Sequence, residues 1–140
     1  MAMITAMLLW ACNDRIEVQR AYDFSLSSWY LPTSIAVDEP VEIRFTLDRS
    51  GDYHEASYQI GYIQLSGEGA VTDVSGAELV SREFIPLTRL PGLNTANPAA
   101  YTFSLYYTNR TTKRAELRFI VRDSFGQEKQ LVASFDNKTE

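Results

Sequence analysis

The chain has 140 residues, with 13 Lys and Arg against 18 Asp and Glu, and a formal net charge of -5. This length suits a single domain with a sizeable core. A nucleic-acid-binding surface needs clustered Lys and Arg, and the sequence lacks such a cluster because its basic residues are interleaved with acidic ones. The single Cys and single His exclude an internal disulfide framework, a Cys-based zinc site and a multi-histidine metal centre.

The N-terminal residues, MAMITAMLLWAC, form an uncharged apolar run that ends at the Cys. The run is shorter than the roughly 20 apolar residues that a transmembrane helix needs, but it matches the apolar region of a signal peptide. Leu9-Trp10-Ala11-Cys12 resembles the lipobox of bacterial lipoproteins, in which the Cys is lipidated and becomes the N-terminus after cleavage. We therefore expect residues 1–12 to be a signal remnant that ends at a lipidated Cys12. The alternative is an ordinary cysteine on a first strand.

The next part of the chain reads as strands separated by turns. Residues 16–30 are strand-like but uneven, and Leu31-Pro32 ends them because proline removes a ladder donor. A short strand is expected at residues 35–37, followed by a turn at Asp38-Glu39-Pro40. Residues 41–48 then alternate strictly between apolar and polar side chains, which indicates a strand with one buried face.

The middle of the chain is less regular. A strand is expected from Tyr53 to Leu65, with a bulge at Gly61, where the apolar parity shifts. Residues 66–98 contain several Gly and Pro and predict one or two short strands plus a long connection of unassigned role. Residues 101–108 alternate again and predict another regular strand.

The stretch from Arg114 to Phe135 predicts an antiparallel hairpin. Both arms alternate, and a polar turn at residues 123–127 separates them. Ile120 is the one apolar residue on the polar side of the first arm. Because a lone hairpin is barely stable in water, a second sheet must cover its apolar face, which consists of Ala115, Leu117, Phe119, Val121, Leu131, Ala133 and Phe135.

These segments give about seven to eight short strands and no amphipathic helix. The pattern predicts an all-β fold: an immunoglobulin-like two-sheet antiparallel sandwich, formed by residues 13–140 as one domain. The Cys and Trp core of antibody domains is absent, so the sandwich would be of the disulfide-free kind. A jelly roll or another small sandwich is the alternative.

The sequence offers few groups for chemistry. We interpret Asp38-Glu39 and Gly67-Glu68-Gly69 as turns, and His54 as a structural residue at a loop–strand junction. Acidic residues at one end of a sandwich are an alternative calcium site, but their spacing fits no known calcium loop; these residues are Asp48, Asp52 and Asp123. We therefore predict no catalytic residue, no cofactor and no metal site.

Aromatic side chains are the remaining candidates for a site. Trp29, Tyr30 and Tyr106 lie in strands whose aromatics occupy both parities, so some of them must face outward. Exposed aromatics are favoured at interfaces, and these residues are our candidate partner surface. The alternative is ordinary packing in the core and at its rim.

Several segments together resemble a known family. The lipobox-like LWAC, ACNDRIEVQRAYDF, SIAVDEPVEIRF and the terminal RFIVRDSFGQEKQL are similar to the TraQ family, which are small lipoproteins of conjugative transposons from Gram-negative gut bacteria. The resemblance covers the chain from about Cys12 to its end. It implies an immunoglobulin-like sandwich, a role in conjugative transfer, no enzymatic activity and no site residue other than Cys12.

The resulting hypothesis is a non-enzymatic envelope protein, anchored to a membrane by a lipid at Cys12. It would be an accessory component of a mating apparatus and would contact other envelope proteins of that apparatus, and not nucleic acid. The alternative is a surface glycan-binding or adhesin module, in which Trp29, Tyr30 and Tyr106 would stack on sugar rings.

Overall fold

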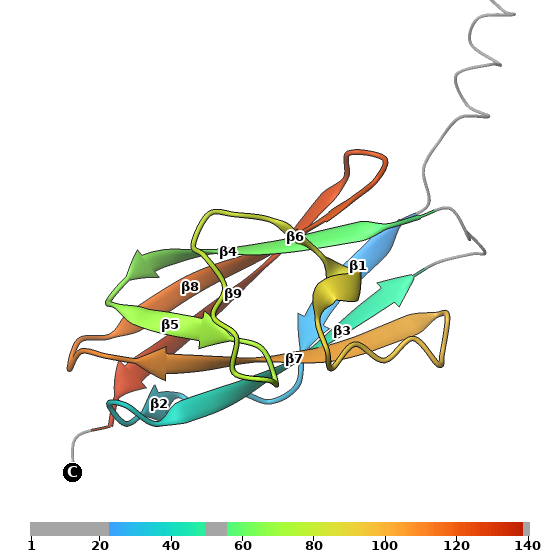
Figure 1. Cartoon of the computed structure of the whole chain (residues 1–140). Coiled ribbons are helices and arrows are strands. Elements are labelled where there is room, and N and C mark those ends of the chain that lie inside the picture. Colours follow the sequence, from blue (N-terminus) through green and yellow to red (C-terminus); the bar gives the residue numbers. More distant parts are fainter. Residues whose placement is uncertain (1–22, 50–55, 139–140) are drawn as a thin grey trace, which may run out of the picture.

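The computed structural model describes residues 23–49 and 56–138. The predictions for Cys12, Asp52 and His54 therefore lie outside the described residues. Figure 1 shows that the chain forms two layers of sheet. The four-stranded sheet contains, in spatial order, β1 (Phe24–Ser28), β3 (Pro40–Arg49), β7 (Ala100–Asn109) and β5 (Gly69–Thr72). The five-stranded sheet contains, in spatial order, β2 (Ser34–Ile35), β9 (Glu128–Asn137), β8 (Ala115–Asp123), β4 (Tyr58–Ser66) and β6 (Ile85–Pro86).

The strand order confirms the predicted immunoglobulin-like sandwich. If the two-residue strands β2 and β6 are set aside, the remaining strands can be lettered A to G along the chain. The sheets then read ABED and GFC, which is the order of a constant-type immunoglobulin domain. The sandwich is not wholly antiparallel, because β2 pairs with β9 in the parallel direction. The described part of the chain contains nine strands, against the seven to eight expected.

The core lies between the sheets, where the alternating positions of the long strands meet. Ile43, Phe45 and Leu47 of β3 are fully buried. Phe45 stacks on Phe103 of its own sheet and meets the edge of Phe119 of the facing sheet, each at a ring-centroid distance of 5.0 Å. Burying one such side chain contributes about 1.5–3 kcal/mol, and each aromatic pair adds roughly 0.5–1.5 kcal/mol.

The predicted hairpin consists of β8 and β9. All four apolar residues predicted for its first arm are fully buried, as are Ala133 and Phe135 of the second arm, whereas Leu131 is half-buried. Ile120 faces the opposite side of the sheet, where it pairs with Gly61 of β4. It is nevertheless buried, so the outer face of this sheet is partly covered.

The prediction of a bulge at Gly61 is wrong. The pairing of β4 with β8 stays in register through Gly61 and shifts between Gln64 and Ser66. Close packing explains why a glycine occupies this position. A Cβ atom at Gly61 would lie 3.0 Å from the backbone oxygen of Glu83 and 3.2 Å from the Phe84 ring. Residues 83–84 therefore pass so close to β4 that they leave little room for a side chain at this position.

Residues 66–98 form the short strands β5 and β6, the 3-10 turn η1 (Leu87–Arg89) and the connection between them. Because β5 pairs with β7 and β6 pairs with β4, this region runs from one sheet to the other along the side of the sandwich (Figure 1). Leu79, Leu87 and Leu90 are buried and extend the core beneath it. In the described ranges, no helix has the length and apolar character needed to cross a membrane.

Candidate functional site

The acidic residues considered as calcium ligands have other roles where they are described. The Asp123 carboxylate accepts hydrogen bonds from the backbone N–H groups of Phe125 and Gln127, at 3.0 and 2.7 Å, and therefore holds the hairpin turn. Asp48 lies on β3 as an exposed residue. Across residues 23–49 and 56–138, no group of three or more His, Cys, Asp or Glu side chains is arranged to hold a metal ion.

The Asp38-Glu39 pair forms a turn, as predicted. Asp38 has a positive φ of 66°, and its backbone N–H donates to the carbonyl of Asn109 at 2.8 Å. Both side chains are exposed. The pair is therefore a solvated connection before β3 and offers no arrangement for proton transfer.

Trp29 is the large aromatic side chain best placed to meet a partner. It follows the last residue of β1, and its backbone N–H donates to the carbonyl of Arg44 on β3 at 2.9 Å. The indole is 56% exposed, although the Arg44 guanidinium lies 4.4 Å from the ring centroid and Nε1 donates to Thr46 Oγ1 at 3.4 Å. These contacts hold the ring in place while its remaining surface is open to solvent.

Tyr106 lies on the same side of the four-stranded sheet. Leu105 and Tyr107 of β7 point into the core, so Tyr106 between them points outward. Tyr106 pairs with Glu42, and the next outward residue of β7, Ser104, pairs with Arg44. Ser104 Oγ donates to Glu42 Oε2 at 2.7 Å. We call the outward surface formed by Trp29, Glu42, Arg44, Ser104 and Tyr106 the aromatic face.

The predicted partner residues are therefore only partly brought together. Trp29 and Tyr106 share the aromatic face, with β3 between them, and Tyr106 is half-buried. Tyr30 is 88% exposed but lies beyond the end of β1, outside the regular register of the sheet. Tyr30 is therefore accessible to a partner, but the sheet does not determine the direction in which its side chain points.

Sequence reasoning missed a buried polar cluster at one end of the core. Asn109 is fully buried, and its Nδ2 donates to the carbonyl of Lys113 at 3.2 Å. The hydroxyl of Tyr107 accepts from Gln64 Nε2 at 3.0 Å and donates to Asn109 Oδ1 at 3.4 Å. Burial raises the pKa of Tyr107, although the Gln64 hydrogen bond lowers it in part. Such a cluster specifies how the loops at this end pack.

A shallow pocket of about 400 Å³ opens beside this cluster. Its charged residues, Glu68 and Arg110, come from two loops that the hydrogen bond from Arg110 N to Glu68 O joins at 2.8 Å. Burial raises the pKa of Tyr62 in the pocket wall, and the charge of Glu78 raises it further. The remaining lining residues are Gln64, Gly67, Gly69 and Ser81. The wall thus combines opposite charges with an aromatic ring and has no paired nucleophile and base.

A family model described as TraQ conjugal transfer protein matches residues 1–138. Similar solved structures include a conjugative transposon lipoprotein from Bacteroides eggerthii, with 25% identity, 84% of this chain and 100% of that chain covered, and a TM-score of 0.67. A lipoprotein from Bacteroides thetaiotaomicron is 34% identical over 91% of this chain and 90% of its own, with a TM-score of 0.67. A conjugate transposon protein from Bacteroides vulgatus is 28% identical over 87% and 90%, with a TM-score of 0.66. No curated protein matches the chain.

Proposed function

The chain belongs to the TraQ conjugal transfer protein family, and from this premise we propose that it is a non-enzymatic, lipid-anchored accessory of a conjugative transfer apparatus in the cell envelope. Within the apparatus it acts through contacts with other envelope proteins. The net charge of -5 favours a protein partner over the transferred DNA, because a phosphate backbone binds to clustered positive charge.

The anchor in this proposal is a lipid on Cys12. It is supported by the lipobox-like sequence before the Cys and by the similar structures that are described as lipoproteins. Several acyl chains would hold the domain firmly, since each buried methylene contributes about 0.8 kcal/mol. Cys12→Ser should move the protein from the membrane fraction to the soluble fraction, whereas Met7→Leu, a conservative change within the apolar run, should not. Retention of Cys12→Ser in membranes would remove the anchor from the proposal.

The observation that carries the contact mechanism is the exposure of Trp29 on the aromatic face. A Trp in contact with an Arg, on the same face as a Tyr, has the composition of an interface hot spot. The Arg44 guanidinium already orients the indole, so a partner that covers Trp29 meets a side chain that has little conformational freedom left to lose.

Mating assays with Trp29→Ala test this mechanism. A central hot-spot residue contributes about 2 kcal/mol or more, which corresponds to a loss of roughly 30-fold in affinity, and we expect a clear fall in transfer frequency. Val80→Ala is the matched control, because Val80 is 57% exposed but lies in the connection after β5. Thermal denaturation should show that both variants are folded. Normal transfer with Trp29→Ala would contradict the proposed role of the aromatic face.

A glycan-binding module is the second candidate, since an exposed Trp also stacks on sugar rings. Binding of the purified protein to a glycan array, lost in Trp29→Ala while transfer stays normal, would support that candidate and contradict the first. Deletion of the gene separates the two more simply, because the first requires a lower transfer frequency.

A further inference from the structure

The outer face of the five-stranded sheet, on the opposite side of the sandwich from the aromatic face, presents an arginine without a counter-ion. Arg118 of β8 pairs with Ile63 of β4 on one side and with Val132 of β9 on the other. Since Leu117 and Phe119 are buried in the core, these three side chains point outward. Arg118 therefore stands in a row between two β-branched aliphatic residues.

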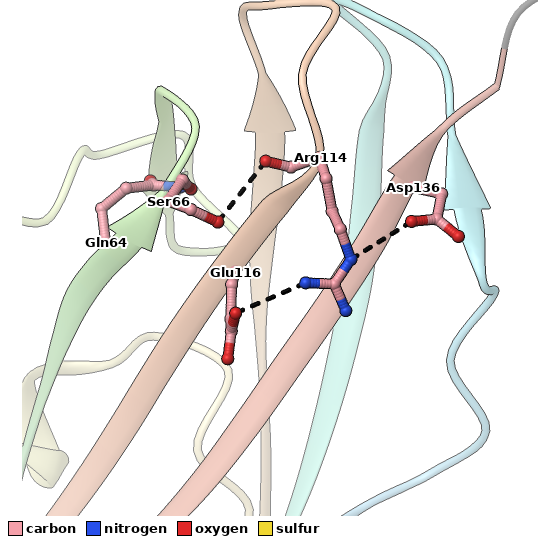
Figure 2. A network of polar contacts seen from close by, with 5 residues as sticks. All are labelled: Gln64, Ser66, Arg114, Glu116 and Asp136. Carbon is pink, nitrogen blue, oxygen red and sulfur yellow. Dashed lines mark hydrogen bonds and ion pairs between the residues drawn. The ribbon is translucent and has the colours of Figure 1, made fainter.

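The other charged residues of β8 and β9 on this face form ion pairs with one another. Figure 2 shows Arg114 between two carboxylates: its Nε lies 3.2 Å from Asp136 Oδ1 and its Nη1 lies 3.5 Å from Glu116 Oε1. At the other end of β8, Arg122 Nε lies 2.9 Å from Glu128 Oε2. All three pairs are partly exposed, so each contributes little to stability, and their carboxylates pair with Arg114 and Arg122 and not with Arg118.

Arg118 itself forms no ion pair or hydrogen bond within the described residues, and its Nε is buried without an acceptor. A buried donor that lacks a partner costs free energy. The apolar setting also lowers the effective dielectric constant around the guanidinium, so a carboxylate brought to it from outside would interact more strongly than at an open surface. Although the whole chain carries a net charge of -5, the unpaired guanidinium of Arg118 is a local positive charge that attracts an acidic group.

We propose that the row Ile63–Arg118–Val132 is a second docking surface, and that its occupant is a protein partner that presents an Asp or Glu carboxylate flanked by aliphatic side chains. Val132 is 50% exposed and provides the apolar contact beside the ion pair. This inference goes beyond the proposed function, which uses the opposite sheet. With two faces in use, the domain would bridge two proteins of the envelope.

Photo-crosslinking from position 132 tests the proposal in donor cells that express the full chain. Val132 is replaced by a benzophenone-bearing amino acid, and the attached peptide is identified by mass spectrometry. We expect that peptide to contain an acidic residue next to aliphatic ones. Arg118→Glu should reduce the crosslink by roughly 30-fold or more, as for the loss of one member of a desolvated interfacial charge pair. Changing the partner's acidic residue to Arg should restore it.

The matched control is Arg110→Glu, which makes the same charge change at an exposed loop residue and should leave the crosslink intact. Arg118→Met keeps an unbranched chain of similar length and should remain as stable as wild type while losing the crosslink, which separates binding from folding. A crosslink that survives Arg118→Glu, a product whose peptide lacks an acidic residue, or no protein product at all would overturn the inference. None of these outcomes bears on Trp29, so the two faces are tested separately.

Discussion

The Asp123 carboxylate is the polar side chain whose removal should most weaken the β8–β9 hairpin. It is 6% exposed and accepts three hydrogen bonds, from Phe125 N at 3.0 Å, Gln127 N at 2.7 Å and Gln127 Nε2 at 2.7 Å. At about 1 kcal/mol for each bond, Asp123→Ala should lower the free energy of unfolding by about 3 kcal/mol. That is a large part of the roughly 5–15 kcal/mol typical of a domain and corresponds to a fall of about 10 °C in Tm.

Asp123→Asn provides the matched comparison. Its amide oxygen can still accept from the backbone N–H groups of Phe125 and Gln127, so only the bond to the Gln127 side chain is lost. The expected cost is about 1 kcal/mol. Urea denaturation followed by Trp fluorescence gives both values. If the Ala and Asn variants were equally stable, or if Ala cost less than about 0.5 kcal/mol, the carboxylate would not hold the turn as described.

Three further predictions concern the core and its edges. Gly69→Ala should lower the free energy of unfolding by about 3 kcal/mol, because its Cβ would lie 2.4 Å from a backbone oxygen and 2.5 Å from a tyrosine hydroxyl of β7. Gly76 has a positive φ but nothing within 4 Å of its Cβ position, so Gly76→Ala should cost only about 1–2 kcal/mol. Equal losses of stability in the two variants would contradict the packing account. Burial raises the pKa of Tyr62, so the unfolded chain loses this proton at a lower pH than the folded chain does. The free energy of unfolding should therefore fall as pH rises above about 10. Over this pH range, the urea midpoint of Tyr62→Phe should fall less than that of the wild type. Phe45→Ala should cost about 3–5 kcal/mol in urea unfolding, whereas Phe125→Ala, at a 51% exposed position, should change stability little.

Several long-range features could not be predicted from the sequence. The bulge of β4 lies next to Gln64, whose Nε2 donates to the carbonyl of Ser66 at 2.7 Å and to the hydroxyl of Tyr107 at 3.0 Å. A partner 43 residues away in the chain leaves no local pattern around Gly61 or Leu65. Asn109 is a second example. Its sequence context is typical of a polar turn, yet the packing of the loops buries its side chain completely.

The candidate sites follow the same division. Tyr106 and Tyr107 are neighbours in one strand and so point to opposite faces of the sheet. The sequence could therefore indicate that one of these two tyrosines faces outward. The second sheet decided which one, because it covers Tyr107 and leaves Tyr106 half-exposed. The second docking surface could not be predicted from the sequence, because Ile63 and Val132, the neighbours of Arg118, come from two other strands.

By itself, the sequence determined the long strands, their inward faces and the two-layer fold. This is possible because side-chain direction in a strand alternates with period two, and the alternation is written into neighbouring residues of β3, β7 and β8. Tertiary structure alone decided which charges find partners, which polar groups are buried and which surfaces remain open. Those outcomes depend on contacts between strands that are distant in the chain, and only the pairing of the strands brings them together.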